Sequence, residues 1–315
     1  MSGREAAREG QQGGQQQQQR VAVLDAEYGK RGVRVLQLRR DPRGLHVVRE
    51  VRARLLLSLA SLADYERGDN AAVVPTDTLK NTVHALALAN GIRCLEEFAS
   101  QLCEHVMRTH GRVDRVRASL TETPWRRMNL DGKPHNHAFV LSPEVEFYCD
   151  VEAQQYGPPL VRSGLRGLRV LKTAQSGFEG FAREGFASLE ASRDRLFCTE
   201  MEARWAFQRG LPLSARDYDE ARERVRACLL EAFAGPPDTG VYSPSVQHTL
   251  YLAGQSVLQS LPHVEDIRIT MPNLHYTPID LRKLGLKNND QVFLPTSSPA
   301  GLISATVCRQ ATAKL

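Results

Sequence analysis

Apolar and polar positions alternate in two runs near the start of the chain. The runs, residues 33–39 and 45–59, flank an Asp-Pro-Arg-Gly turn, and this pattern predicts a β-hairpin. Residues 78–88 and 95–108 instead carry apolar residues at helical spacing, and Asp77 stands where an N-cap is expected. Two helices are therefore predicted to follow two strands.

After the two helices the alternation typical of strands returns, and the second half of the chain repeats the first half's order of strands and helices more loosely. The first half continues with a strand at residues 113–121 and a second strand at 137–141 that continues through 145–151, which gives the order ββααββ. In the second half, strands are expected at 167–172, 196–207, 264–270, 291–294 and 302–307, and helices at 215–233 and 245–259. The Pro-bearing segment 156–164 is the expected boundary between the halves. Antiparallel strands with helices on one face predict an α+β fold.

Composition indicates a globular protein without a membrane span. The chain has 315 residues, of which 42% are hydrophobic, enough for two ordinary domains or one large one. No stretch reaches the roughly 20 apolar residues that cross a bilayer, and no apolar secretory signal opens the sequence. Residues 1–20 are rich in Gln and Gly, and we expect a disordered tail there.

Charge and cysteine usage narrow the possible partners. The net charge is +5, but basic residues are interleaved with acidic ones, which disfavours nucleic-acid binding. A mild positive field would instead gather a small anion. The six cysteines form no C-x-x-C pair, so neither a zinc knuckle nor a disulfide framework is indicated, and a reducing compartment is expected.

Residues 164–195 carry groups suited to a flat anionic ligand. A strand-like run leads into a Gly- and Ser-bearing turn that presents Phe178 and Phe181, and the stretch ends at Arg195. An aromatic face can stack on a ring while a guanidinium binds its edge with two donors. Taken alone, the same residues also fit ordinary core.

The motif VLKTAQSGFEGF at residues 170–181, followed by Arg195, resembles the signature of the urate oxidase family. Other landmarks occur in family order, namely YGK at 28–30, PTDTLKNTV at 75–83, SPSVQ at 243–247 and MPNLHY at 271–276. The resemblance runs from about Tyr28 to Val307, and one departure is Ala174, where relatives usually carry Ser or Thr.

The resemblance implies two tandem tunnelling-fold (T-fold) domains, expected at residues 21–156 and 157–310. Their antiparallel sheets would close into a barrel in a homotetramer. It also implies oxidation of urate by O₂ and water to 5-hydroxyisourate and hydrogen peroxide, without metal or organic cofactor. No dinucleotide or P-loop motif follows any expected strand.

The resemblance assigns catalysis to a Lys30–Thr76 dyad that relays a proton, with His275 joining the relay. Urate must lose a second proton before it can give an electron to oxygen, and a lysine whose pKa is lowered by burial can act as the base. From local sequence alone, Lys30 also fits an exposed surface lysine, and Thr76 a hydroxyl at a helix start.

The resemblance further assigns residues to the purine and to O₂. Phe178 would stack on the ring, Arg195 would bind its carbonyl edge, and the Gln247 amide and Val246 N–H would complete recognition. Thr76 and Asn273 would hold dioxygen, and the substrate set is Thr76, Asp77, Phe178, Arg195, Val246, Gln247 and Asn273. Because the family site is built between subunits, Lys30 and Thr76 would face the ring-binding residues of another chain.

Some of these residues have plainer local interpretations. Gln247 also fits a helix cap, Asn273 a turn, and His275 an ordinary hydrogen-bonded histidine. His135 and His137 share a face, but without a third ligand at suitable spacing we interpret them as structural and predict no metal site.

The last three residues, Ala313-Lys314-Leu315, resemble the Ser-Lys-Leu peroxisomal address. We therefore expect residues 311–315 to form a targeting tail read by the peroxisomal import receptor, and a peroxisomal location.

Two other functions stay open at this point. One is a zinc-dependent cyclohydrolase of the same fold, and the other is a catalytically silent oligomeric binding protein.

Overall fold

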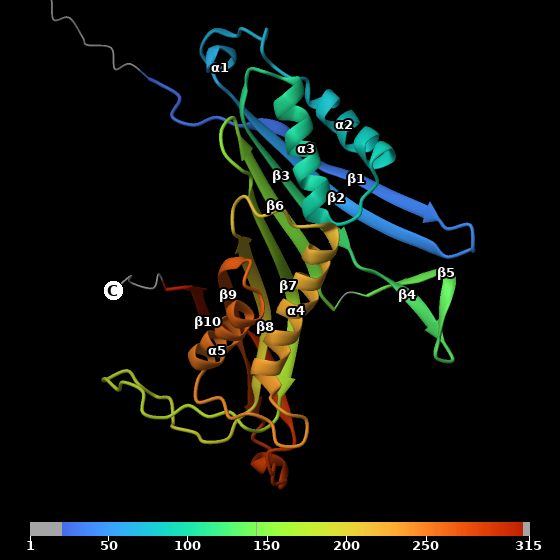
Figure 1. The fold of residues 1–315 in the computed structure, drawn as a ribbon. Helices are drawn as coiled ribbons and strands as arrows, with labels where there is room; N and C mark the ends of the chain where they lie inside the picture. Colours follow the sequence, from blue (N-terminus) through green and yellow to red (C-terminus); the bar gives the residue numbers. More distant parts are fainter. Residues whose placement is uncertain (1–20, 143, 311–315) are drawn as a thin grey trace, which may run out of the picture.

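The computed structural model describes residues 21–142 and 144–310, and its centre is one antiparallel sheet of eight strands (Figure 1). The predicted tail 1–20 and targeting tail 311–315 lie outside these residues. The sheet order is β1 (Tyr28–Arg40), β2 (His46–Leu59), β3 (Val113–Thr123), β6 (Glu146–Gln154), β7 (Leu160–Lys172), β8 (Phe197–Phe207), β9 (Val264–Pro278) and β10 (Phe293–Cys308). A separate hairpin, β4 (Trp125–Leu130) and β5 (Lys133–Leu141), projects from this body.

The long helices cover one face of the sheet (Figure 1). They are α2 (Thr76–Ala89), α3 (Leu95–Thr109), α4 (Ala215–Ala234) and α5 (Val246–Ser260), with short turns at α1 (Ala63–Arg67) and η1 (Arg282–Leu284). Strand β2 shows why the layers form, because Ala53, Leu55 and Leu57 are buried in the core while the alternate residues Arg52 and Arg54 stay exposed. Each such leucine contributes about 1.5–3 kcal/mol through burial. In the part of the chain described, no helix is long and apolar enough to span a bilayer.

The predicted hairpin and both first-half helices are confirmed, but the expected N-cap is wrong. Helix α2 begins at Thr76, and Pro75 occupies the N-cap position with φ −57°. Asp77 lies inside the first turn, where it pairs with Lys80. Proline sets a backbone angle suited to helix entry, so the helix starts earlier than the Asp pattern indicates.

Two further expectations about strands are corrected. Residues 137–141 and 145–151 follow each other in sequence but enter different sheets, since β5 pairs with β4 and β6 pairs with β3 and β7. The strands expected at 291–294 and 302–307 are parts of one strand, β10, whose register with β9 shifts between Thr296 and Gly301. That irregularity interrupts the alternation of apolar and polar residues along β10, so the sequence pattern does not show that the two parts form one strand.

The sheet continues across the expected boundary between the halves. β6 and β7 pair from Glu146 opposite Arg166 to Glu152 opposite Leu160. Strands from the first and second halves of the chain are therefore hydrogen-bonded to each other. The division into two domains at residue 156 stays a prediction.

A buried charge network joins the halves beneath this ladder. Arg222 of α4, with 5% of its side chain exposed, lies 3.0 Å from Glu122 and 3.7 Å from Glu96, and it also pairs with Asp219. The fully buried Glu96 of α3 accepts a 2.5 Å hydrogen bond from Ser163 of β7. One guanidinium thus neutralises carboxylates from both halves.

Substituting Arg222→Met should lower the free energy of unfolding by about 3 kcal/mol, because buried Glu96 would lose its counter-charge. The matched control is Arg216→Met on the same helix, whose ion pair with Glu220 is exposed and screened by solvent, so its loss should change the free energy of unfolding far less. Thermal melting at one protein concentration compares the two variants. Equal melting temperatures would contradict the assigned role of Arg222.

Candidate active site

The first group of predicted site residues lies at the edge of the sheet. Lys30 is on β1, an edge strand, and its Nζ lies 3.5 Å from Oγ1 of Thr76 at the start of α2. Both side chains are half-buried. The structure therefore brings together the lysine and the threonine that the family resemblance pairs.

Two neighbours of Lys30 explain how this contact is held. The Tyr28 hydroxyl accepts a 2.7 Å hydrogen bond from the Val74 N–H, which ties the segment before α2 to β1. Burial raises the pKa of Tyr28, so its hydroxyl stays protonated at neutral pH. At Gly29, an added Cβ would overlap the Leu55 carbonyl, so glycine allows β1 to approach β2 closely.

Asp77 stands next to this pair but faces solvent. Its carboxylate accepts hydrogen bonds from Lys80 and from Asn81, the latter at 3.0 Å. The hydrogen bond from Lys80 is the main cause that lowers the pKa of Asp77, and the Lys30 charge adds to the effect. Asp77 therefore carries negative charge beside the Lys30 side chain.

The second group lies in the long loop between β7 and β8. Phe178 and Ser192 exchange backbone hydrogen bonds of 2.7 and 3.1 Å, and the Arg195 N–H donates to Ser176 O at 2.8 Å. These bonds place the Arg195 guanidinium carbon 5.3 Å from the Phe178 ring centre. Phe181 stacks on the same ring at 4.9 Å with an interplanar angle of 7°. The predicted aromatic and guanidinium groups are thus neighbours.

Arg195 is placed to accept a ligand. Its Nε is buried and has no hydrogen-bond partner among the described residues, and burial lowers the pKa of the guanidinium. Gly177 leaves no room for a side chain, since an added Cβ would overlap the Tyr242 hydroxyl. An unpaired donor beside an aromatic ring suits a planar ligand with a carbonyl edge.

Val246 and Gln247 begin helix α5. The cap is Ser245, whose hydroxyl accepts a 3.1 Å hydrogen bond from the His248 N–H, so the interpretation of Gln247 as the capping residue is wrong. Gln247 is exposed and Val246 is 4% exposed. At a first helical turn the backbone N–H groups have no partner within the helix, which suits the recognition role expected at Val246.

Asn273 and His275 lie within β9, one strand in from the edge. Asn273 stands opposite Thr199 of β8 and Gly301 of β10, and His275 stands opposite Thr296. Alternation directs both side chains to one side of the sheet, with Asn273 half-buried and His275 exposed. The interpretation of Asn273 as a turn residue is therefore wrong.

A single chain does not join these groups. Lys30 and Thr76 lie at β1 and α2, whereas three strands, β2, β3 and β6, separate β1 from β7 and the loop that follows it. Figure 1 shows the β7–β8 loop, in yellow-green, at the other end of the molecule from α2.

The two histidines of the hairpin, His135 and His137, pack against each other, and His137 also packs against His46 of β2. The His135 and His137 rings meet edge to face at 4.7 Å, and His135 Nδ1 accepts from the N–H groups of His137 and Ala138. Within residues 21–142 and 144–310, no group of three or more His, Cys, Asp or Glu side chains is arranged to hold a metal ion.

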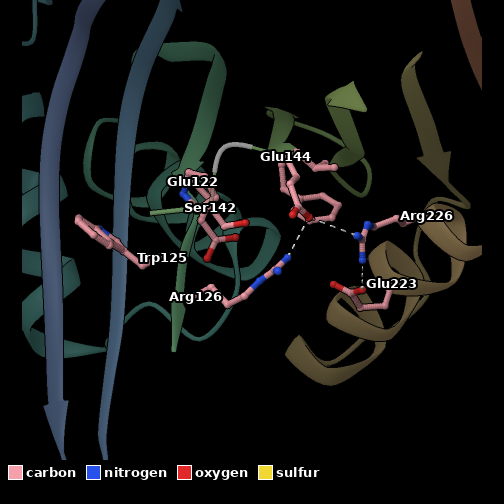
Figure 2. A pocket seen from close by; sticks show the side chains of 10 residues that line it. Glu122, Trp125, Arg126, Ser142, Glu144, Glu223 and Arg226 are labelled. Atoms are coloured by element: carbon pink, nitrogen blue, oxygen red, sulfur yellow. Dashed lines mark hydrogen bonds and ion pairs between the residues drawn. The ribbon is translucent and has the colours of Figure 1, made fainter. Parts of the chain in front are cut away.

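A cavity of about 220 Å³ lies between the base of the β4–β5 hairpin and α4, away from every predicted site residue. Figure 2 shows Glu144 between Arg126 and Arg226, at 3.2 and 3.8 Å, with Glu223 beside Arg226. Arg126, Glu144, Glu223 and Arg226 of its lining pair with one another and link the hairpin to the helix.

Sequence reasoning missed Lys172, the last residue of β7. Its Nζ donates hydrogen bonds to the carbonyls of Phe233 and Val241 and to the Ser243 hydroxyl. The residue stands inside the recognised motif, but its partners are about 60 to 70 positions away, so no local pattern reveals them.

Comparisons with known proteins agree with this arrangement. The uricase family profile matches residues 26–152 and 161–304. The uricase of Danio rerio is 44% identical over 94% of this chain and 98% of its own length, and that of Oryctolagus cuniculus is 42% identical over 94% and 97%. The crystal structure of uricase from Arthrobacter globiformis superposes with a TM-score of 0.85 at 31% identity, covering 93% of this chain and 97% of the other.

These matches extend over both sheet edges and over the loop that holds Phe178 and Arg195. They confirm the predicted α+β tunnelling fold and the resemblance drawn from the separated motifs. The chain therefore belongs to the uricase, or urate oxidase, family.

Proposed function

We propose that this protein oxidises urate with O₂ and water to 5-hydroxyisourate and hydrogen peroxide, without a metal or organic cofactor. The observation that carries the proposal is the pairing of two unusual contacts, Lys30 with Thr76 and Arg195 with Phe178. The reaction balances, because urate loses two electrons and one proton and gains a hydroxyl from water, which releases a second proton, while O₂ takes up the two electrons and both protons.

The β7–β8 loop and the start of α5 would bind the substrate. Phe178 stacks on the purine, Arg195 donates to its carbonyl edge from a guanidinium that lacks a protein acceptor at Nε, and Gln247 supplies an amide. The Val246 N–H adds a further donor. Purines without the matching carbonyls would leave these groups unpaired, which would select for urate.

The β1–α2 edge would supply the proton chemistry. Lys30 takes the second proton from urate and passes it through Thr76, which lies in direct contact, and His275 completes the relay. Thr76 and Asn273 hold dioxygen against the ring, and Asp77 lies at the edge of the same site. The substrate supplies the electrons, so these residues contribute position and charge.

The complete site would form between two copies in a homotetramer. β1 and β10 are the unpaired edges of the described sheet and are 13 and 16 residues long, which favours pairing with another chain. Lys30 lies on one edge, and Asn273 and His275 lie beside the other. Closing sheets into a barrel would bring opposite edges together.

Peroxisomal location is part of the same proposal. The terminal Ala313-Lys314-Leu315 occupies the position that the import receptor reads, and confinement suits an enzyme that releases peroxide.

The direct test follows urate's ultraviolet absorbance and peroxide release by the purified tetrameric protein in the presence of a strong chelator. Loss of urate with one peroxide per urate is expected. Absence of turnover, or turnover that stops with chelator and returns with zinc, would overturn the proposal and favour a metal-dependent enzyme. Urate binding without turnover would instead favour a binding protein.

Substituting Lys30→Met should lower kcat about 100-fold or more, because the proton acceptor is lost, while anaerobic urate binding weakens much less. Lys287→Met, at an exposed lysine in the β9–β10 connection, is the control. Steady-state kinetics and binding without oxygen separate the two quantities. Unaltered kcat would remove Lys30 from the dyad.

Substituting Arg195→Gln should weaken urate binding about 10- to 100-fold, because a charge-assisted donor is lost. Arg193→Gln is a close control, since that side chain is 86% exposed and pairs with Glu179 at 3.0 Å. Anaerobic equilibrium dialysis with urate measures both. Equal affinity in the two variants would contradict the assigned role of Arg195.

A further inference from the structure

Lys172 places a positive charge directly behind the loop that carries Phe178. Its Nζ lies 2.7 Å from Ser243 Oγ, 2.9 Å from Val241 O and 3.2 Å from Phe233 O. These acceptors belong to the end of α4 and to the segment that leads into α5. One ammonium thus holds three parts of the chain together, and all of its protons are used.

The surroundings of Lys172 are apolar rather than acidic. The Phe197 and Phe233 ring centres lie 5.8 and 5.4 Å from Nζ, and in the described ranges no carboxylate lies within ion-pair distance of it. Burial lowers the pKa of Lys172 to about 8. A half-buried ammonium without a counter-charge depends on its hydrogen bonds, so the contacts with Phe233, Val241 and Ser243 fix its position.

Ser243 connects this ammonium to the loop. Its hydroxyl lies 2.8 Å from the Thr249 hydroxyl of α5. Its backbone N–H donates to Gln175 O at 2.8 Å, and its carbonyl accepts from the Gly177 N–H at 2.9 Å. Ser243 therefore forms a short ladder with the residues just before Phe178, and Lys172 fixes its side chain.

The same connections reach the other binding residues. Ser176, which bridges to Ser243, accepts the backbone hydrogen bond of Arg195. Ser243 also lies three residues before Val246 and four before Gln247. The Lys172–Ser243 contact thus lies where the β7–β8 loop meets the segment before α5. These two segments carry the binding residues proposed there, namely Phe178, Arg195, Val246 and Gln247.

We propose that Lys172 is a positioning residue for urate, which acts through Ser243 to hold the β7–β8 loop and the start of α5 in the binding arrangement. This inference rests on the proposed function, and it adds a residue that contacts no substrate. It predicts an effect on affinity that is separate from the proton chemistry at Lys30 and Thr76.

The first test is Lys172→Met, which keeps most of the stem and removes the ammonium. Anaerobic urate binding should weaken about tenfold, with a matching rise in KM. The kcat at saturating urate should stay within about twofold, because bound urate still meets Lys30. A drop in kcat with unchanged affinity would overturn the positioning role.

Ser243→Ala provides the second test, because it removes the acceptor without removing a charge and is less disruptive to folding. It should also weaken urate binding, and combining it with Lys172→Met should add little further loss, since both changes break one contact. Additive losses would overturn the coupling through Ser243.

Controls separate this inference from the proposed function. Lys287→Met should leave both constants unchanged. If the wild-type protein binds no urate without oxygen, the proposed function itself fails. If the wild type binds and oxidises urate but Lys172→Met and Ser243→Ala retain full affinity, with or without a lower melting temperature, only the role of Lys172 fails.

Discussion

Backbone pairing across a single open sheet is the constraint on which the rest of the molecule depends. In the described part of the chain, eight antiparallel strands form one sheet, and the long helices cover one of its faces. β1 and β10 are the unpaired edges of this sheet. Exposed strand edges of this length favour pairing with another chain. The same order keeps Lys30 away from Arg195 within one chain, so the ladder determines where each half of the proposed site lies.

The two halves of the site are built by different means. Lys30 and Thr76 are held by regular elements, with Tyr28 tying the start of α2 to an edge strand. Phe178 and Arg195 lie in a long loop that becomes ordered through backbone hydrogen bonds and through the Lys172–Ser243 contact. A loop can adapt to a ligand's shape, but it needs such internal ties to hold a fixed geometry.

Local patterns predicted much of the fold. Alternation around the Asp-Pro-Arg-Gly turn gave the β1–β2 hairpin, and helical spacing gave α3 and α4 within about a residue or two. Long-range choices were not predictable, because β5 and β6 carry similar strand patterns yet enter different sheets. Asp77 was misplaced because Pro75 is the N-cap and the helix begins at Thr76, one residue before Asp77. The register shift before Gly301 hid the continuity of β10.

For the candidate site, the separated motifs identified the family, but their spatial relation required the structure. The contact between Lys30 and Thr76 spans 46 residues and that between Lys172 and Ser243 spans 71, so neither follows from local sequence. The structure supports the pairing within each half of the site. Within one chain the two halves stay apart, and the proposal is that a second copy of the chain joins them.

Subunit complementation tests that central claim most directly. Lys30→Met and Arg195→Gln chains, each impaired alone, would be co-assembled in equal amounts and assayed for urate oxidation. If one copy supplies Lys30 and another supplies Arg195, random mixing should restore about a quarter of the wild-type activity, because a quarter of the sites contain both intact halves. Mixed tetramers that remain as impaired as the separate variants would show that the site does not form between subunits.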